Sequence, residues 1–249
     1  MRVAAIYDIH GNLPALRAVL DEIRAASADL IVVGGDVLPG PMPVETLACL
    51  FNLTIPVEFI QGNGEVAVLA DLAGKQAYAL PEQAREAIHW TAQQLSAEHA
   101  QAVRSWPKTF RIDIRGVGPV MFCHGTPRNE NEIFTRRTAE AVLMPLFDGL
   151  NATTIVCGHT HMQFDRMVGK TRVVNAGSVG MPFGEPGADW LLLGSEAALR
   201  HTNYDLSAAA DRIRQTKYPQ AGDFVERNLL HPPSEELMLK LFKPAELKG

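Results

Sequence analysis

Short apolar runs and amphipathic segments follow one another along the first sixty residues. Residues 3–7, 30–33 and 57–60 have the length and composition of buried strands, and each is followed by a loop containing glycine. Between them, residues 13–26 and 44–53 place apolar side chains at helical spacing. This βαβαβ order predicts a parallel sheet covered by helices.

The pattern changes in the middle of the chain. Residues from about 66 to 108 contain a charged, Ala- and Gln-rich stretch without strand signals, which predicts a helical insert beside the sheet. Two C-terminal helices are expected within about 205–243, and we expect residues 1–249 to form one domain. Further strands are predicted at 110–114, 120–123, 154–157, 164–168, 171–174 and 190–193.

Composition and charge narrow the class of protein. The 249 residues are 47% hydrophobic and 20% charged, which is typical of a globular protein and excludes general disorder. The net charge of −5 disfavours a nucleic-acid polymer or a membrane surface as partner. The first residues do not resemble a signal peptide, and three widely spaced cysteines form no disulfide framework. We expect a cytoplasmic protein, with a homo-oligomer left open.

Side chains that bind metals recur directly after the predicted strands. Because ligand sites in open α/β sheets form outside the carboxyl ends of the strands, we expect these side chains to converge. They comprise two carboxylates, four imidazoles and one amide: Asp8, Asp36, His10, His124, His159, His161 and Asn63.

Seven such ligands are too many for one tetrahedral zinc and suit two divalent metals that share a carboxylate. Manganese is favoured, with iron, zinc, nickel and magnesium as alternatives. Two metals roughly 3.5–4 Å apart form a clamp for phosphoryl transfer, in which a bridging hydroxide attacks phosphorus. Their charge favours an anionic substrate, so the expected partner is a small phosphate ester.

The sequence resembles the calcineurin-like metallophosphoesterase family, and is most similar to its short prokaryotic-type members. The resemblance covers about three-quarters of the chain and lies in five ordered blocks. These blocks are Asp8-Ile9-His10, Gly35-Asp36, Gly62-Asn63-Gly64-Glu65, His124 and Gly158-His159-Thr160-His161.

The resemblance implies a four-layer α/β/β/α sandwich of two mixed sheets. It also implies that Asp36 bridges the two metals and that Asp36, His124 and Asn63 act in catalysis. The first metal would be held by Asp8, His10, Asp36 and His161. The second would be held by Asp36, Asn63, His124 and His159.

One position departs from the family pattern. Members of the family usually have a His after Gly-Asn, and this His is assigned to phosphate contact and leaving-group protonation. Here Gly64 occupies that position, although the acidic residue that follows in the pattern is present as Glu65. General acid catalysis contributes about 10²–10⁴-fold, so we expect a slower enzyme or one that needs good leaving groups. The alternative from another class is a non-catalytic scaffold of this fold that binds a partner protein.

Four residues near the blocks stay open to two interpretations. Asn12 is a turn residue or a donor to the substrate phosphate, alongside Asn63. Arg128 either binds the phosphate bidentately or forms a surface salt bridge. Cys123 and Cys157 precede predicted ligands, and buried free thiols are favoured over ligands there.

Overall fold

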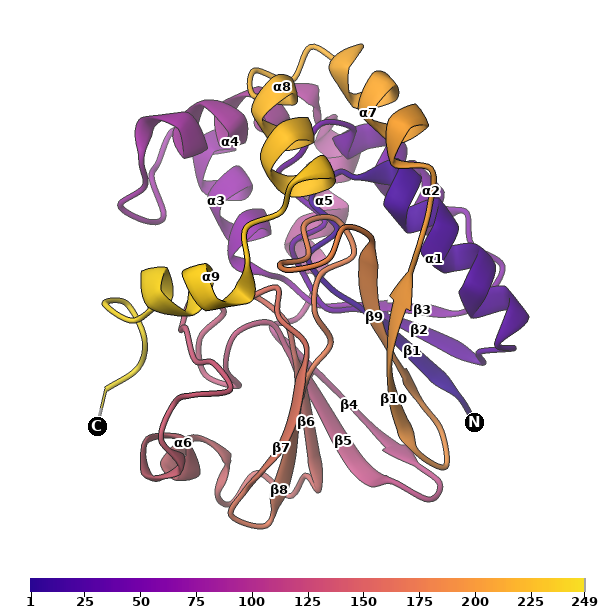
Figure 1. Ribbon diagram of the computed structural model, residues 1–249, viewed down its shortest axis with the longest axis vertical. Coiled ribbons are helices and arrows are strands. Elements are labelled where there is room, and N and C mark those ends of the chain that lie inside the picture. Colours follow the sequence, from indigo (N-terminus) through magenta and orange to yellow (C-terminus); the bar gives the residue numbers. More distant parts are fainter. Residues whose placement is uncertain (249) are drawn as a thin grey trace.

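The computed structural model describes residues 1–248 and arranges its strands in two mixed five-stranded sheets (Figure 1). The first sheet has the order β10-β9-β1-β2-β3 and the second β4-β5-β6-β8-β7. The first sheet contains β1 (Val3–Ile6), β2 (Leu30–Val33), β3 (Val57–Phe59), β9 (Ala188–Leu193) and β10 (Ala197–Thr202). The second contains β4 (Thr109–Ile114), β5 (Gly118–Cys123), β6 (Thr154–Cys157), β7 (Phe164–Val168) and β8 (Thr171–Asn175).

Each sheet contains three neighbouring strands that run parallel. In the first sheet β1, β2 and β3 run parallel, with Ile6 opposite Val33, while β9 pairs antiparallel with β1. In the second sheet β5, β6 and β8 run parallel, with Phe122 opposite Val156. The carboxyl ends of the parallel strands in one sheet therefore lie at one edge, which is where a ligand site is expected.

Helices cover the outer faces and the carboxyl ends of the sheets (Figure 1). The N-terminal helices are α1 (Leu13–Ala25), α2 (Pro43–Phe51) and α3 (Asn63–Leu72). The insert continues with α4 (Glu82–Gln94) and α5 (Ala97–Ser105), and α6 (Glu140–Phe147) lies on the second sheet. The chain ends with α7 (Leu206–Arg214), α8 (Ala221–Phe224), a π-helical segment η1 (Val225–Leu230) and α9 (Glu235–Phe242).

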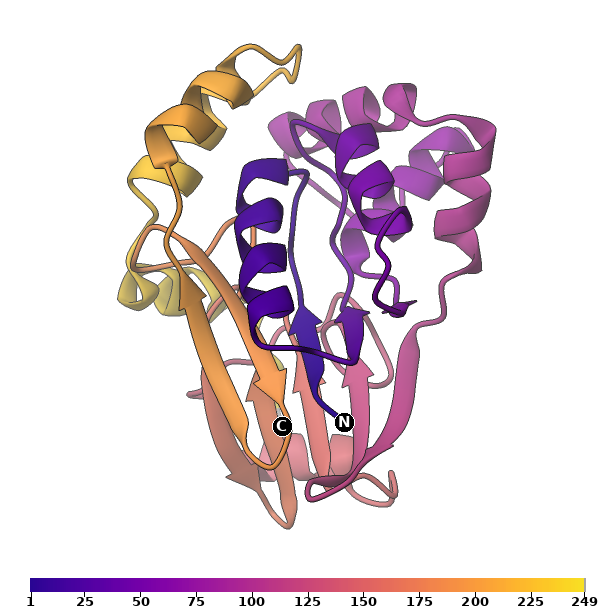
Figure 2. The ribbon, with the colours of Figure 1, turned by 90° about the vertical axis from the view of Figure 1, so that its right-hand side faces the viewer.

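The layers follow from the alternation of side chains along the strands, which point to opposite faces of a sheet. In β1, Ile6 packs under the helices of the first sheet, whereas Ala5 packs between the two sheets. In β5, Phe122 faces the first sheet and Met121 packs with Leu143 of α6. Figure 2 shows α1 and the first sheet in front of the second. The predicted four-layer α/β/β/α fold is confirmed.

Five elements differ from the predictions. Two of them, α8 and η1, lie between the two expected C-terminal helices and were not predicted. The strand β10 was not predicted because only half of its six residues are apolar and only Thr202 is buried. Helix α6 was missed because Pro145 lies inside it, where proline normally ends a helix. Helix α3 begins at Asn63, so the helical insert starts earlier than the predicted residue 66. None of the helices among residues 1–248 is long and apolar enough to cross a membrane.

Candidate metal centre

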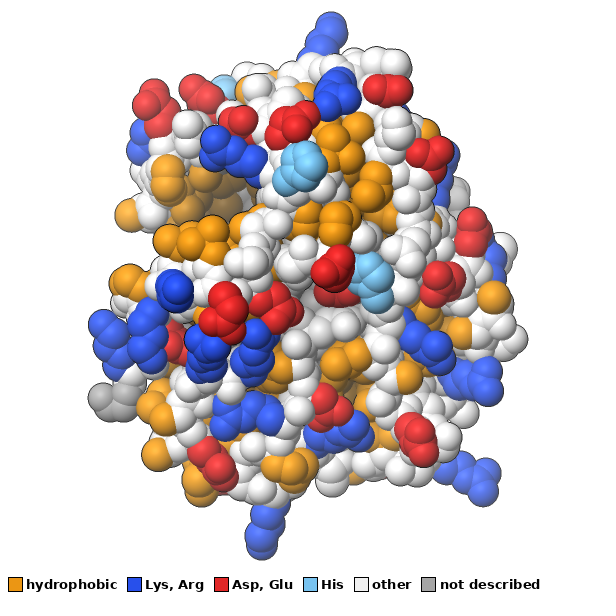
Figure 3. All heavy atoms as spheres, viewed as in Figure 1, with side chains coloured by type: hydrophobic (Ala, Val, Ile, Leu, Met, Phe, Trp, Pro, Cys, Tyr) orange, Lys and Arg blue, Asp and Glu red, His pale blue; other side chains and the backbone are white. Residues whose placement is uncertain are grey.

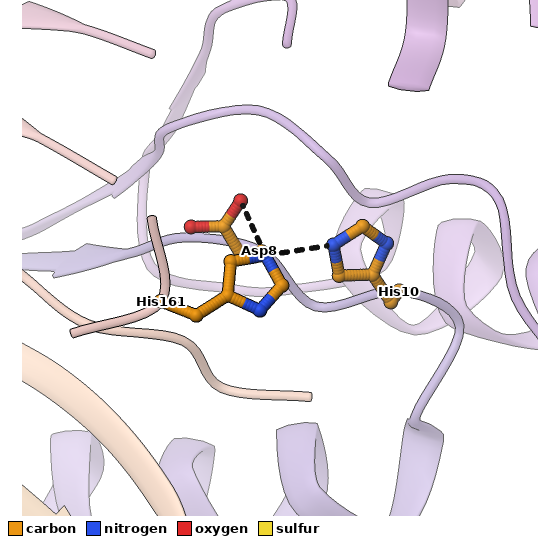
Figure 4. A group of neighbouring side chains, drawn as sticks. All are labelled: Asp8, His10 and His161. Atoms are coloured by element: carbon orange, nitrogen blue, oxygen red, sulfur yellow. Dashed lines mark hydrogen bonds and ion pairs between the residues drawn. The ribbon is translucent and has the colours of Figure 1, made fainter. Parts of the chain in front are cut away.

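All seven predicted ligands follow strands or begin α3, and both sheets contribute to the cluster that they form. Asp8 and His10 follow β1, and Asp36 follows β2. The other ligands come from the β3–α3 junction and from the ends of β5 and β6: Asn63, His124, His159 and His161. Figure 4 shows Asp8 and His10 on one segment, with His161 reaching toward both from another.

Three of these side chains form a first group of potential ligand atoms. The Nε2 atoms of His10 and His161 lie 3.2 Å apart, and Asp8 Oδ1 lies 3.4 Å from His161 Nε2 (Figure 4). All three ligand atoms lie within 4.8 Å of one another, which is close enough to share a cation.

A second group surrounds His124. Its Nε2 lies 3.4 Å from Asp36 Oδ1, 3.7 Å from Asp8 Oδ1 and 3.0 Å from Asn63 Oδ1. Asp36 also reaches the first group, because its Oδ2 lies 3.7 Å from His10 Nε2. The two carboxylates therefore connect two neighbouring groups of ligand atoms.

Backbone carbonyls determine which nitrogen of each imidazole can bind a metal. His124 Nδ1 lies 2.9 Å from the Gly34 carbonyl, and His161 Nδ1 lies 2.8 Å from that of Met181. A ring nitrogen that donates to a carbonyl leaves the other nitrogen with its lone pair. These contacts direct the Nε2 lone pairs into the cluster, where His10 and His161 face each other. The two Nε2 atoms lie within hydrogen-bonding distance of each other, and a shared cation would take the place of that contact.

Backbone strain is concentrated at the same residues. Seven residues other than glycine have positive φ, and five of them are predicted ligands. Such conformations cost on the order of 1–3 kcal/mol each and gather at functional sites. The five are Asp8 (52°), His10 (46°), Asp36 (53°), His159 (67°) and His161 (56°). The strand ends turn sharply there, so that residues two apart in sequence both point into one cluster.

The charges of the cluster balance one another in the buried site. Burial alone would raise the pKa of Asp36, but the neighbouring imidazoles, His124 above all, lower it. Burial opposes the protonated form of His124, but Asp36 and Asp8 raise its pKa to about 10. Burial, followed by the charge of His124, lowers the pKa of His159 to about 4. The carboxylates thus keep their charge and His159 is a neutral imidazole. The same carboxylates hold His124 protonated, so a cation bound at His124 Nε2 would displace a proton.

Two atoms of the cluster have no hydrogen-bond partner. Asp8 Oδ1 and His159 Nε2 are two of only three buried side-chain polar atoms without one among residues 1–248. Leaving such an atom unpaired costs roughly 1–3 kcal/mol, so two in one cluster point to a missing partner. Both are lone-pair donors beside carboxylates, and divalent transition metals bind this donor set. The residues present therefore fit a metal.

Glu65 holds the loop that carries Asp36. Its carboxylate accepts from the backbone N–H groups of Asp36 (2.8 Å), Gly62 (2.8 Å) and Leu38 (3.0 Å). Burial, followed by the charge of Asp36, raises the pKa of Glu65 to about 7. The structure supplies three backbone donors instead of a side chain.

Gly64 leaves no room for the histidine of the family pattern. Its N–H donates to Asp36 Oδ1 at 2.7 Å, and a Cβ atom at this position would lie 2.0 Å from the Leu38 carbonyl oxygen. The loop after β2 therefore occupies the space next to position 64. The backbone N–H of Gly64 orients the Asp36 carboxylate.

Asn12 and Arg128 form hydrogen bonds and an ion pair with residues outside the cluster. Asn12 caps α1, accepting from Ala15 N, and its amide donates to the Gly180 carbonyl and to the Tyr204 hydroxyl. These bonds use both amide hydrogens, so the structure favours the turn role over a phosphate contact. Arg128 is exposed and pairs with Glu132, with Nη2 and Oε1 2.8 Å apart, as in the salt-bridge interpretation.

The two cysteines beside the ligands are free and buried. Cys123 Sγ lies 3.7 Å from the Gly125 carbonyl oxygen, and Cys157 Sγ lies 3.7 Å from that of Val174. Burial raises the pKa of both thiols, so the thiolate form that binds metals is disfavoured.

A pocket of about 360 Å³ adjoins the cluster and was not predicted. His10, Asp36 and Asn63 line it at the cluster, and residues of α4 and of the C-terminal segment line the rest. No motif marks the C-terminal contributors. Their spacing at 220, 223, 224, 227 and 228 is the only sequence feature that places them on one face of a helix.

Comparisons with known proteins agree with this geometry. A family model of the calcineurin-like phosphoesterase superfamily domain matches residues 1–196. The chain therefore belongs to the calcineurin-like phosphoesterase superfamily, as the sequence motifs predicted.

Similar proteins support the fold over most of the chain. An uncharacterized protein of Methanocaldococcus jannaschii is 26% identical over 242 residues, covering 88% of this chain and 94% of that protein. The structure of a metallophosphoesterase from Sphaerobacter thermophilus has a TM-score of 0.70 at 25% identity, covering 91% of this chain and 98% of the other. A hypothetical protein from Pyrococcus horikoshii has a TM-score of 0.79 at 20% identity, covering 94% and 99% of the two chains.

Proposed function

We propose that the protein is a binuclear metal-dependent phosphoesterase that hydrolyses small phosphomonoesters or phosphodiesters, including those of nucleotides. The observation that carries the proposal is the pair of unpartnered atoms, Asp8 Oδ1 and His159 Nε2, inside a buried cluster of carboxylates and imidazoles. Membership in the phosphoesterase superfamily supports the same chemistry.

The ligand roles follow the family pattern. Asp8, His10 and His161 would hold one divalent metal, and Asn63, His124 and His159 the other, with manganese favoured. Asp36 would bridge them, because its Oδ2 faces His10 and its Oδ1 faces His124. Asp8 Oδ1 also lies near both His124 and His161, but the family pattern assigns the bridge to Asp36.

When bound, the metals supply Lewis-acid activation of water and of the phosphoryl group. The protein contributes the rigid arrangement of ligands. Gly64 N–H fixes the Asp36 carboxylate, and the Gly34 and Met181 carbonyls fix the imidazoles of His124 and His161. Such preorganisation keeps the donors in place during the reaction.

Substitution of the bridging carboxylate tests the proposal. Asp36→Asn removes a negative charge and one oxygen donor, so Mn²⁺-dependent hydrolysis of p-nitrophenyl mono- and diesters should fall at least about hundredfold. The assay is run with purified protein in the presence of Mn²⁺, with and without a chelator. Asp113→Asn, at an exposed position in β4, is the matched control and should retain wild-type rates.

Retained turnover in Asp36→Asn would contradict the bridging role. Wild-type protein that hydrolyses the esters equally well with chelator would contradict the metal dependence. Wild-type protein that hydrolyses none of them with Mn²⁺ would contradict the phosphoesterase itself. The last result is the one that the scaffold alternative predicts.

A further inference from the structure

The pocket beside the metal cluster has a lining that indicates what kind of ester enters it. We propose that this pocket binds a flat apolar group, an aryl ring, carried by the phosphate ester. The inference rests on the proposed function, because the metals must hold the phosphate at the end of the pocket. It adds the substrate class and the residues that select it.

The pocket is continuous with the cluster. His10, Asp36 and Asn63 belong both to the predicted ligands and to the pocket lining. A phosphate held by these residues therefore places the organic group of the ester in the pocket. The volume of about 360 Å³ lies in the range of small-ligand sites.

The walls of the pocket are apolar and come from distant parts of the chain. The segment before α4 contributes Tyr78 and Leu80, α4 contributes Ile88, and the C-terminal segment contributes Tyr218 and Phe224. Figure 3 shows a hollow with hydrophobic side chains around it between the insert and the C-terminal helices. Burying apolar surface of a ligand there would contribute affinity in proportion to its area.

The aromatic side chains of the wall are held in place by their neighbours. Tyr218 packs edge-on against Trp90 of α4, with ring centroids 5.4 Å apart, and against Phe224 at 6.3 Å. The Tyr78 hydroxyl donates to Glu130 at 3.0 Å. Because these side chains are already held in place, binding a ligand costs little conformational entropy. A flat ring can stack against the aromatic side chains or contact them edge-to-face.

The polar part of the lining that lies away from the cluster is on the C-terminal segment. Asp223 and Arg227 are exposed and Asn228 is half-buried. These side chains form the rim of the pocket, where water can solvate them. We therefore expect the apolar ring to lie deeper in the pocket, against Leu80 and Ile88.

Two phosphate esters isolate the contribution of the ring. We compare 2-phenylethyl phosphate with ethyl phosphate, because both release a primary alkyl alcohol of similar leaving ability. Full burial of a side chain of Phe size corresponds to about a 10- to 100-fold effect, so kcat/KM should favour the phenylethyl ester by that factor. Affinities of the Mn²⁺-loaded protein for 2-phenylethylphosphonate and methylphosphonate, measured by calorimetry, should show the same preference without turnover.

Two wall variants should weaken the preference. Leu80→Asn replaces a half-buried apolar side chain of the wall, with the exposed Leu72→Asn as matched control. Ala84→Phe fills the pocket from a half-exposed position on α4, with the exposed Ala97→Phe as its control. Both wall variants should reduce the phenylethyl preference at least about threefold and leave ethyl phosphate within about twofold of wild type, and both controls should keep the preference.

The outcomes separate this inference from the proposed function. Hydrolysis of both esters at equal kcat/KM, with equal phosphonate affinities, would overturn the inference and leave the phosphoesterase standing. Absence of turnover for every ester would overturn the phosphoesterase, and a phosphonate preference that the wall variants weaken would still support the pocket. A preference that the wall variants leave unchanged would place the ring elsewhere.

Discussion

Gly64 is the residue at which this chain departs from the family pattern, and its surroundings explain what the departure means. The Leu38 carbonyl oxygen lies 2.0 Å from the position that a Cβ atom of residue 64 would take. The backbone of the loop after β2 therefore occupies the space that a side chain would need. The N–H of Gly64 bonds to Asp36 Oδ1 at 2.7 Å. Gly64 therefore offers no side chain to the substrate, and its backbone instead contacts the predicted bridging ligand.

Adding a single methyl group at this position tests that interpretation. Gly64→Ala forces the Leu38 carbonyl or α3 to move, so we expect a loss of about 1–3 kcal/mol in the free energy of unfolding. Chemical denaturation of the metal-free protein measures it. Gly222→Ala is the matched control, because a Cβ there meets nothing within 4 Å, and it should be neutral or slightly stabilising. Wild-type stability in Gly64→Ala would contradict the close approach.

The sequence predicted which side chains come together in the cluster more completely than it predicted their surroundings. Asp8, Asp36 and His124 could be found because an apolar run ending in a polar side chain marks the carboxyl end of a strand. The contact between Gly64 and Leu38 could not be found, because it depends on the path of the loop after β2. The capping role of Asn12 was one of two alternatives, and only its three hydrogen bonds favour it.

At the scale of elements, the first turn of α3 organises the loop after β2. Glu65 lies in that turn, is fully buried and accepts three backbone N–H groups, two of them from Asp36 and Leu38. A helix terminus and a strand end that are separate in sequence are thereby joined, and Asn63 and Asp36 are brought to the same cluster.

Replacing one carboxylate oxygen of Glu65 by an amide tests this connection. In Glu65→Gln an NH₂ group faces a backbone N–H, which leaves a buried donor unpaired at a cost of about 1–3 kcal/mol. Denaturant unfolding of the metal-free protein should show this loss, with an unchanged dependence on denaturant. Glu58→Gln, exposed in β3, should be neutral, and equal stability of the two variants would show that Glu65 does not hold the loop.

Element predictions succeeded where the hydrophobic period was strong. Leu13, Leu16 and Val19 mark α1, and β6 and β7 have the predicted bounds. The pocket-forming role of the C-terminal segment could not be predicted, because Phe224 and Arg227 acquire it only by packing opposite α4, more than 130 residues away in the sequence.

At the scale of the whole molecule, the cluster of predicted ligands lies where the two sheets meet. The first sheet supplies Asp8, His10 and Asp36, and the second supplies His124, His159 and His161. A buried layer that includes Tyr7, Phe122 and Val156 packs between the sheets directly behind these residues. The relative position of the sheets therefore fixes the distances between ligands, and bound metals would in turn hold the sheets together.

Anomalous diffraction from crystals of the wild-type protein soaked in Mn²⁺ tests the central claim most directly. We expect two peaks roughly 3.5–4 Å apart. One should lie among Asp8, His10 and His161, and the other beside Asn63 and His124, with Asp36 in contact with both. A single peak, two peaks that Asp36 does not join, or no peak at the cluster with Mn²⁺ in excess would contradict a binuclear centre.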